Sequence, residues 1–521
     1  EGILRSLENA IECGIKPEEL IAYHCNGKVA RNWDSYNKIV KALMELEDDE
    51  TLIIQSGKPV LVTKTNRQVA RVIHCNSLLL GKWDNPETFH KLEEEGLTMF
   101  GSISGAAWTW SFRGEELAPT YEVLKIVARE HYGGTLRGRM FLSAGLGGAG
   151  SAQPVACKLN EGVCLIVEAD EARIRQRKEE RVIDVTMDNL DEALDLAEKA
   201  VEKKEPLAIA LLGNTGDVYP EMVKRGVTPD IVTDQTPYDR LPYGIIPAGL
   251  SPEEADVMRK EKPEEFIRRA TENAMKVAKA MLQFKERGAV IYDYGTGLKA
   301  LAISAGLEEA SKIDFYGVYM RQNILKGRDF FRFAALSGDS VDIDKIDETV
   351  VRELASDKVI VNWVKSVREA PPPPKGLPER TYFLFHGQRR IARIINGMVR
   401  NGILKAPIIL YRGCFTFVSS PQITAGIKDG SDGIADWTHL ISILSAMVGA
   451  DYIATTGLGS GDAVVSRWFV VLDGTKETDE RLERLLRADA ELTIARWADA
   501  GYEEPRRIAK ELGVKMPSLS S

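Results

Sequence analysis

The stretch Gly145-Leu146-Gly147-Gly148-Ala149-Gly150 decides the fold of the middle of this chain. It follows an apolar run at residues 140–142, and a second apolar run at residues 163–167 ends at Glu168. In the pattern Gly-x-Gly-x-x-Gly, the first glycine permits a tight turn and the second lets backbone approach a ligand. The third lets a helix pack closely on a strand. The sequence therefore predicts a phosphate-binding turn at the start of a parallel βαβ unit.

Glu168 indicates which dinucleotide such a turn binds. A carboxylate at the end of the second strand accepts the ribose hydroxyls and disfavours a 2′-phosphate. The pattern therefore favours NAD over NADP. A glycine-rich loop that only turns the chain is the alternative that these residues leave open.

Apolar runs and helical patterns continue to alternate after this turn. Further apolar runs lie at residues 207–212, 229–233 and 289–292. The longest helical region opens with Ser251-Pro252-Glu253-Glu254, which combines a capping box with proline in the first turn. This alternation is typical of a parallel sheet, in which ligands bind at the carboxyl ends of the strands. The loops at residues 213–215 and 234–236 are therefore expected to face the dinucleotide.

The flanking parts of the chain have a mixed α/β pattern. Strand-like runs lie at residues 51–55, 59–63, 381–385, 407–410, 452–454 and 468–472. The four prolines at residues 371–374 predict an extended spacer or an edge loop. A chain of 521 residues is too long for one ordinary hydrophobic core, so two or three domains are expected.

Composition and charge exclude several classes of protein. Hydrophobic residues make up 44% of the chain and charged residues 28%, as in soluble globular proteins. The formal net charge of −9 argues against nucleic acid as a partner. No apolar run reaches the roughly 18 residues that a membrane span needs, so no membrane partner is expected. The six cysteines form no C-x-x-C pair, which favours a reducing compartment, the cytoplasm.

Three other motifs carry side chains that could perform chemistry. His-Cys-Asn occurs at residues 24–26 and 74–76, but adjacent residues point apart on a strand and no further ligands complete a tetrahedron, so no metal is expected. Arg412 could activate Cys414, although a buried inert thiol is more common. Arg332 lies among aromatic residues, where a guanidinium can bind a carboxylate or simply cover aromatic surface.

Longer sequence motifs throughout the chain resemble those of one family. They include Ala30-Arg31-Asn32-Trp33, Gln55-Ser56-Gly57-Lys58-Pro59-Val60, the glycine turn with Ser151-Ala152-Gln153-Pro154, Val232-Thr233-Asp234-Gln235-Thr236, Ala334-Ala335-Leu336-Ser337-Gly338-Asp339, Asp429-Gly430-Ser431-Asp432-Gly433-Ile434-Ala435-Asp436-Trp437 and Asp499-Ala500-Gly501-Tyr502-Glu503-Glu504. These motifs, in this order, are similar to motifs of the urocanase (urocanate hydratase) family.

The resemblance implies a fold and a chemistry. It implies a homodimer in which a Rossmann-like NAD-binding domain, residues 134–318, is inserted into a discontinuous α/β core domain, residues 1–133 and 319–521. It also implies a tightly held NAD⁺ that acts as an electrophile toward an imidazole-acrylate substrate, so that water adds without net redox change. In that chemistry the protein supplies orientation and electrostatics.

The family's site residues transfer by position onto this chain. The implied cofactor contacts are Gly148, Ala149, Gly150, Glu168, Arg173, Asn214, Thr215, Gln235, Thr236, Pro237, Tyr238, Asp239, Ile245, Ile246, Tyr294 and Gly459. The implied substrate contacts are Tyr23, His24, Cys25, Arg332 and Phe415, with Tyr23 and Arg332 as anchors of the substrate carboxylate. Asp436, near the imidazole, and Tyr23 are the candidate catalytic residues.

Departures from the family words cluster near the implied chemistry. Tyr23-His24-Cys25 stands where the family has Tyr-Gly-Gly, and Phe415 aligns with its cysteine, which leaves Cys414 one place off. Pro237-Tyr238-Asp239 replaces Ser-Ala-His, Ile245 replaces a tyrosine, and Ser102 replaces a glutamine. Thr455-Thr456-Gly457 begins the stretch where the family has His-His-Gly. The motifs of the scaffold match the family, whereas residues near the implied site differ from it. This combination indicates the same reaction on a different substrate.

We therefore expect a hydratase for a ring-modified urocanate, such as thiourocanate or a methylated form. Plain urocanate is the alternative substrate. A dehydrogenase that transfers hydride, or a non-catalytic NAD-binding protein, is the alternative of another class.

Overall fold

The computed structural model describes residues 1–23, 25–101, 107–412, 426–457 and 464–518. It divides into two compact units. The core unit comprises Glu1–Glu115, Arg321–Lys365 and Lys375–Ser521, and the inserted unit comprises Glu116–Met320 and Ser366–Pro374. Both units are α/β, so the expected fold class is confirmed.

The inserted unit begins at Glu116, well before the boundary at residue 134 suggested by the sequence. The reason is helix α4 (Arg113–His131), whose end packs within this unit. The hydroxyl of Tyr132, just after α4, donates to the carbonyl of Asp230 at 2.7 Å. The amide of Asn160 donates to the carbonyl of Tyr121 at 3.2 Å. These contacts tie the helix to the sheet that follows it.

The described residues of the inserted unit contain a parallel sheet in the order β12-β11-β10-β6-β7-β9-β8. Its strands are β6 (Met140–Ala144), β7 (Val163–Glu168), β8 (Val185–Met187), β9 (Leu207–Leu212), β10 (Ile231–Val232), β11 (Val290–Asp293) and β12 (Asp314–Phe315). The chain runs outward from β6 in one direction and then returns to β10 on the other side. The order therefore reverses between β6 and β10, where ligands bind in such sheets.

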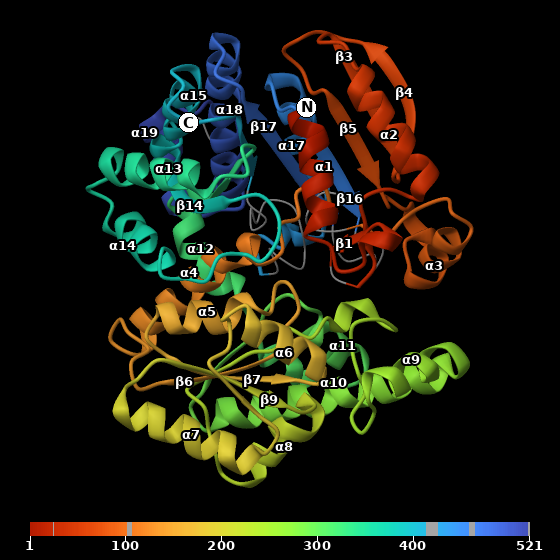
Figure 1. Ribbon diagram of the computed structural model, residues 1–521, viewed down its shortest axis with the longest axis vertical. Coiled ribbons are helices and arrows are strands. Elements are labelled where there is room, and N and C mark those ends of the chain that lie inside the picture. The colour runs from red at the N-terminus through yellow and green to blue at the C-terminus, as the bar shows by residue number, and fades with distance from the viewer. Residues whose placement is uncertain (24, 102–106, 413–425, 458–463, 519–521) are drawn as a thin grey trace. The chain divides into compact units, whose positions relative to one another are not determined.

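Helices cover both faces of this sheet. They are α5 (Ala152–Leu159), α6 (Glu171–Glu179), α7 (Leu190–Lys203), α8 (Thr215–Lys224), α9 (Pro252–Glu261), α10 (Pro263–Glu286) and α11 (Leu298–Ser304). Figure 1 shows α5 and α6 on one face, and α7 and α8 on the other. Ser251 and Glu254 form the expected capping box of α9. The long helical region then breaks at Lys262, where Pro263 starts α10.

The described residues of the core unit contain a mixed sheet in the order β14-β13-β15-β17-β16-β5-β3-β4. Its strands are β3 (Glu50–Gln55), β4 (Lys58–Lys64), β5 (Val72–Asn76), β13 (Arg328–Ala335), β14 (Glu379–Phe385), β15 (Ile408–Arg412), β16 (Tyr452–Gly457) and β17 (Val464–Leu472). A small antiparallel pair is formed by β1 (Ile21–Tyr23) and β2 (Gly27–Lys28). Strands from both ends of the chain thus share one sheet.

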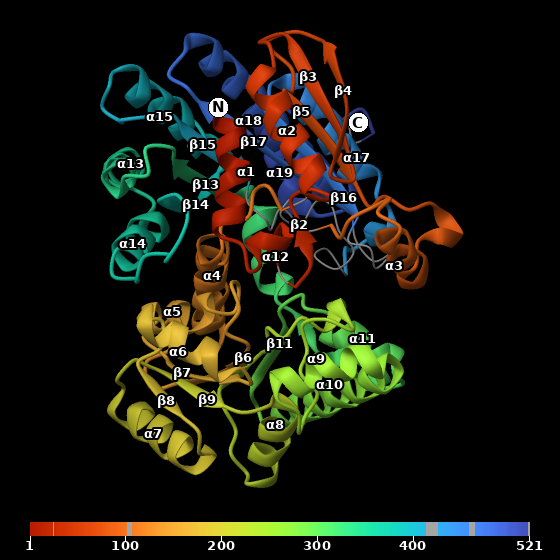
Figure 2. The ribbon, with the colours of Figure 1, turned by 45° about the vertical axis from the view of Figure 1, so that its right-hand side comes forward.

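The helices that follow belong to the core unit in whole or, for α12 and α14, in part. They are α1 (Gly2–Glu12), α2 (Trp33–Glu45), α3 (Pro86–Glu94), α12 (Gly317–Leu325), α13 (Ser340–Glu353), α14 (Lys358–Val367), α15 (Ile391–Arg400), α17 (Asp436–Val448), α18 (Lys476–Asp499) and α19 (Glu503–Leu512). Figure 2 shows α1 and α2 side by side. Helix α17 packs on β16 and β17 through hydroxyls, since Ser442 is bonded to Thr455 and Ser466.

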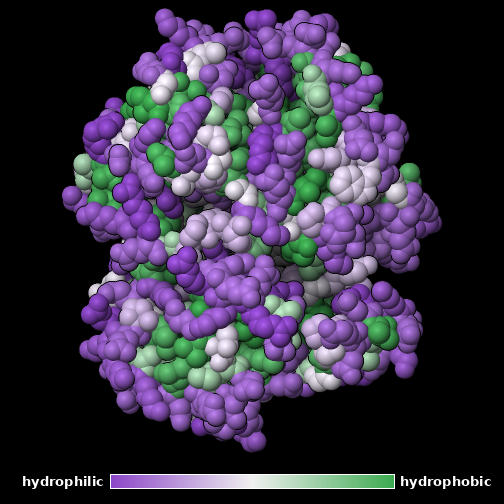
Figure 3. Space-filling view, in the orientation of Figure 1, coloured by the Kyte–Doolittle hydropathy of each residue, from purple (hydrophilic) through white to green (hydrophobic). Residues whose placement is uncertain are grey.

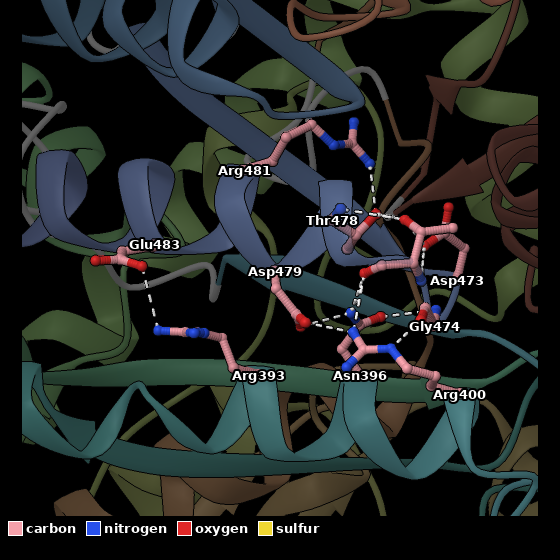
Figure 4. A network of polar contacts seen from close by, with 10 residues as sticks. Arg393, Asn396, Arg400, Asp473, Gly474, Thr478, Asp479, Arg481 and Glu483 are labelled. Carbon is pink, nitrogen blue, oxygen red and sulfur yellow. Dashed lines mark hydrogen bonds and ion pairs between the residues drawn. The ribbon is translucent and has the colours of Figure 1, made fainter.

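A polar network joins α15 to the start of α18 (Figure 4). The amide nitrogen of Asn396 donates to the Thr475 carbonyl at 2.9 Å and to Asp479 at 2.8 Å. Its amide oxygen accepts from the Gly474 N–H at 2.8 Å. Asn396 is fully buried, and both ends of its amide are bonded. These hydrogen bonds offset the cost of removing the amide from water.

Hydrophilic residues cover most of the face of the molecule shown in Figure 3. Across the part of the chain that the structure describes, no helix is long and apolar enough to cross a membrane.

Candidate cofactor and substrate sites

The glycine turn has the geometry that its pattern predicts. Gly145 has a φ of +83°, a conformation that favours glycine, and its N–H donates to the Val167 carbonyl at 2.9 Å. A Cβ on Gly150 would lie 2.0 Å from the Gly145 carbonyl oxygen. The first glycine therefore makes the turn, and the last allows the close approach of α5 to β6.

Gly147 has a different role from its neighbours. A Cβ built on this residue would meet no atom within 4 Å. Its backbone therefore faces open space at the start of the helical turn that leads into α5. The first N–H groups of a helix have no partner within the helix and bind anions such as a pyrophosphate.

Two side chains hold the turn at Leu146. The Glu168 carboxylate accepts a hydrogen bond from the Leu146 N–H at 2.7 Å. The Arg177 guanidinium donates to the Leu146 carbonyl at 2.9 Å. Both side chains are buried. The turn is therefore held on both sides by side chains of the same unit. Arg177 lies within a helical pattern, and nothing in the sequence set it apart.

Glu168 lies at the end of β7, where the sequence analysis expected a ribose-binding carboxylate. Besides the Leu146 N–H, it accepts from the Asp170 N–H at 3.0 Å. Arg173, which is half-exposed, lies beside it at 3.3 Å. The carboxylate thus has a fixed orientation, and Arg173 is the charged side chain next to it. This arrangement suits recognition of a ribose.

The loops after β9 and β10 meet the same edge of the sheet. A Cβ on Gly145 would lie 3.3 Å from the backbone of Gln235, which brings the β10 loop directly beside the glycine turn. Asn214 caps α8 through the Gly216 N–H at 2.9 Å and donates to the Ile246 carbonyl at 2.6 Å. Thr215 begins α8 and is buried. The predicted contacts from three separate loops are therefore brought together within the inserted unit.

Asp234 is a functional candidate that the sequence analysis did not single out. Its carboxylate accepts from the Thr236 N–H at 2.6 Å and from the Tyr238 hydroxyl at 2.7 Å. Burial raises the pKa of Asp234 to about 6, although these hydrogen bonds oppose the shift. The signal that identifies it is an acidic residue directly after a buried strand. Asp234 fixes the conformation of the loop that carries Gln235 and Thr236.

In the loop after β10, the residues that differ from the family motif are mainly structural. Tyr238 and Ile245 are buried in the hydrophobic core of the inserted unit, and Ile246 packs against it. Asp239 pairs with Arg240 at 3.0 Å, and its N–H donates to the Thr296 carbonyl at 2.8 Å. Pro237, next to Tyr238, is half-buried. We therefore expect their backbone, more than their side chains, to contact a ligand.

Tyr294 lies in the loop after β11. Its ring stacks on Tyr316 with the centroids 4.7 Å apart, and its hydroxyl is bonded to that of Thr120. The inserted unit as a whole fits a dinucleotide. It offers an open backbone at Gly147, an oriented carboxylate at Glu168 and polar loops at one sheet edge.

Tyr23 is the predicted substrate residue whose surroundings are clearest. It ends β1, is buried, and meets Trp110 edge to face with the ring centroids 4.8 Å apart. Cys25 is half-buried and is not in a disulfide. Four other residues of interest, His24, Cys414, Phe415 and Gly459, lie outside the described residues.

Arg332 lies on β13 and is buried with a carboxylate, as its aromatic setting suggested. The carboxylate belongs to the chain itself, because Arg332 donates to Glu379 at 2.5 Å. The guanidinium also donates to the Thr109 carbonyl and lies 4.1 Å from the ring centroid of Tyr411. A substrate carboxylate at Arg332 would have to share this guanidinium with Glu379. Its role as an anchor of the substrate carboxylate therefore stays a prediction.

Asp436 is the first residue of α17 and is exposed. The second His-Cys-Asn motif, at residues 74–76, does not gather its side chains at one point. His74 is fully buried, accepts from the Gly57 N–H at 3.2 Å, and has its pKa lowered to about 3 by burial. Cys75, next on β5, is exposed on the other face. Over the described residues, no group of three or more His, Cys, Asp or Glu side chains is placed to hold a metal.

Comparison with protein families matches nearly the whole chain. The urocanase N-terminal domain matches residues 1–109, the urocanase Rossmann-like domain matches residues 117–320, and the urocanase C-terminal domain matches residues 324–511. The Rossmann-like match falls on the unit that carries the glycine turn.

Proposed function

Because this chain belongs to the urocanase family, whose members are hydro-lyases acting on imidazole-acrylate substrates, we propose that it adds water to a ring-modified urocanate with bound NAD⁺. Thiourocanate or a methylated urocanate is the proposed substrate, and plain urocanate is the runner-up. The proposed reaction involves no net redox change.

The glycine turn is the observation that carries the NAD part of the proposal. Gly147 offers open backbone, and Glu168 and Arg177 hold Leu146 from both sides. NAD⁺, when bound, supplies an electron-accepting ring. The residues of this unit would hold its pyrophosphate at the turn and a ribose at Glu168. Gln235 and Thr236 would contact it from the neighbouring loop, which Asp234 keeps in position.

Residues of the core unit would recognise the substrate. Tyr23 is proposed to hold the substrate carboxylate. Arg332 contributes to this contact only if its guanidinium binds both the substrate carboxylate and Glu379. Asp436 is exposed at the start of a helix, so it can exchange protons with solvent, and we propose it as a polar group near the ring. Support for a modified ring comes from Thr456, which stands where the family has a histidine. A hydroxyl offers different hydrogen bonds to a ring than an imidazole does. The neighbouring Thr455, on the other face of the strand, is bonded to Ser442 of α17.

The direct test offers purified protein with bound NAD⁺ each of these compounds and follows the loss of their ultraviolet absorbance. We expect fast loss with a ring-modified urocanate and slow or no loss with plain urocanate. Fast turnover of plain urocanate alone would contradict the ring-modified substrate. A rise of absorbance at about 340 nm would instead indicate hydride transfer.

We also propose that the protein is a homodimer and that α17 lies in the interface. The buried face of α17 is polar, with Thr438, Ser442 and Ser445 toward the sheet. Its exposed side chains include Leu440 at 48%, Ile443 at 58% and Met447 at 66%. An amphipathic surface helix normally has the opposite arrangement. A second copy of the chain would remove this apolar face from water, as homodimer interfaces do.

The cysteines support a cytoplasmic location, which we propose on this ground alone. Of the described cysteines, Cys13, Cys75, Cys157 and Cys164 form no disulfide with one another. Free thiols persist in a reducing compartment.

A further inference from the structure

Two polar side chains lie side by side at the ends of two central strands of the core unit. Asn76 is the last residue of β5, and Thr456 is its register partner on the parallel strand β16. Both are buried, with 1% of Asn76 and 0% of Thr456 exposed. They lie on the face of the sheet that also carries His74, since alternate residues of a strand share a face.

Among the residues that the structure describes, none of the polar atoms of these two side chains has a hydrogen-bond partner. The amide oxygen and the amide nitrogen of Asn76 and the hydroxyl oxygen of Thr456 are buried without a hydrogen bond. Leaving such a group unsatisfied costs about 1–3 kcal/mol. Asn396, in contrast, is buried with both ends of its amide bonded. A native protein retains three adjacent unsatisfied atoms only where something else supplies their partners.

Two of the residues next to this pair must be glycine. A Cβ on Gly101 would lie 2.3 Å from Cγ2 of Thr456 and 3.2 Å from the amide nitrogen of Asn76. A Cβ on Gly457 would lie 2.1 Å from the Ser77 carbonyl oxygen. Glycine backbone therefore packs directly against the pair and keeps the two side chains together. The nearest imidazole on the same face, His74, is neutral and already bonded to Gly57.

We propose that Asn76 and Thr456 form the subsite that reads the substituted edge of the substrate ring. This inference rests on the proposed function. An amide presents a donor beside an acceptor, so its complement is a planar edge with an N–H next to a C=O or C=S. A 2-thio or 2-oxo imidazole ring has this edge, whereas a plain imidazole has no exocyclic acceptor. The Thr456 hydroxyl provides a further donor for the oxygen or sulfur.

The same chemistry has a second source, the carboxamide group of NAD⁺. The subsite predicts a preference of at least about tenfold for a ligand that satisfies the buried amide, because a ligand that leaves it unpaired is rejected. Substrate and cofactor must therefore be measured separately.

The experiment compares the holoenzyme with the variants Asn76→Leu and Thr456→Val, which keep the shape and remove the polar atoms. Each is assayed for kcat/KM and for equilibrium binding with urocanate, 2-thiourocanate and 2-oxourocanate, and NAD⁺ affinity is measured in parallel. We expect the loss with the 2-thio or 2-oxo compound to exceed the loss with urocanate by about tenfold or more. The melting temperature should be unchanged or higher, because no hydrogen bond is lost.

Asn396→Leu is the matched control, because it removes a buried amide that is fully bonded. It should lower the melting temperature and leave the ratio between the ring compounds unchanged. A loss of NAD⁺ affinity in Asn76→Leu with an unchanged ratio would assign the subsite to the carboxamide. An unchanged ratio with unchanged NAD⁺ affinity overturns the inference, as does a wild-type enzyme that binds only plain urocanate. If the wild type hydrates none of the three compounds, the proposed function itself fails.

Discussion

Gly147 and Gly150 occupy one turn, but their hydrogen atoms face different surroundings. Alanine at position 147 would point into open space, and alanine at position 150 would strike the Gly145 carbonyl. Gly147→Ala should therefore leave the melting temperature of the NAD-free protein within about 1 °C of wild type, because it meets no protein atom. It should raise the dissociation constant for NAD⁺ at least about tenfold, because a methyl group separates backbone from pyrophosphate. Calorimetric titration measures this constant.

Two further substitutions make this prediction specific. Gly150→Ala should destabilise the protein by about 2 kcal/mol or more, because backbone must move. Gly397→Ala lies in α15 of the core unit, where a Cβ also meets nothing within 4 Å, and should leave NAD⁺ affinity unchanged. Unchanged NAD⁺ binding in Gly147→Ala would remove the glycine turn from the cofactor site.

Asp234 predicts a pH dependence of stability. Its pKa is raised from 3.8 to about 6 in the folded chain, chiefly by burial. The folded state therefore binds more protons than the unfolded state between about pH 4 and pH 6. The contribution of Asp234 to stability is complete below pH 4 and is lost as the pH rises through 6. By linkage this loss is on the order of 2–3 kcal/mol.

Asp234→Asn removes this titration and should flatten the corresponding part of the pH profile. Urea titration measures the free energy of unfolding of both proteins. Wild type should exceed Asp234→Asn in this quantity by more at pH 4.5 than at pH 7.5. Asp217→Asn, an exposed position in the same unit, serves as the control. A constant difference between wild type and Asp234→Asn across this range would contradict a buried, readily protonated carboxyl.

The placement of an individual residue could be predicted where a local sequence pattern defines its structural role. Gly145, Gly150 and Glu168 lie in the arrangement that the pattern implies, because turn geometry and strand ends follow from nearby sequence. Arg332 was predicted to meet a carboxylate, but Glu379 as its partner was not. An ion pair between residues far apart in sequence leaves no local signal.

At the scale of elements, β13 shows why a strand can be missed. Its residues Arg328–Ala335 are all buried, although three of them are charged. Arg328 pairs with Asp357 at 2.5 Å, and Asp329 pairs with Arg412 at 2.6 Å. Buried charges are tolerated when they are paired and hydrogen-bonded. The sequence showed the charges, while their partners came from other elements.

The exposed face of α17 leads to a prediction about assembly. Ile443→Glu places a charge on a side chain that is 58% exposed and apolar, so it should leave the fold intact. It should also convert a dimer to a monomer, because an unpaired charge in an apolar interface is costly. Sedimentation equilibrium gives the mass in solution.

Met44→Glu is the matched control for this substitution. Met44 lies on α2 and is 73% exposed, but it is not part of the α17 face. Its glutamate variant should keep the mass of wild type. Dimers in both variants would place the interface elsewhere, and a monomeric wild type would remove the homodimer from the proposal.

At the scale of the whole molecule, the order of the strands could not be predicted from the sequence. The strand-like runs at residues 51–55 and 452–454 were each visible, but their place in one sheet was not. β5 lies between β3 and β16 and runs parallel to both. Parallel neighbours that are hundreds of residues apart follow from packing of the whole core unit, which no local pattern records. In the inserted unit, the alternation of apolar runs and helical patterns predicted parallel βαβ units but not the order of the strands.

The strand order of the inserted unit predicts where NAD⁺ protects the chain. The carboxyl ends of β6, β7, β9 and β10 lead into residues 145–150, 168–170, 213–215 and 234–239. Hydrogen exchange with and without saturating NAD⁺ should slow in these four segments, because ligand contact suppresses local opening. Residues 160–162 and 228–230, which precede β7 and β10 at the opposite edge, are the internal control and should change little. Protection confined to that opposite edge would mean that the dinucleotide does not bind at the reversal between β6 and β10.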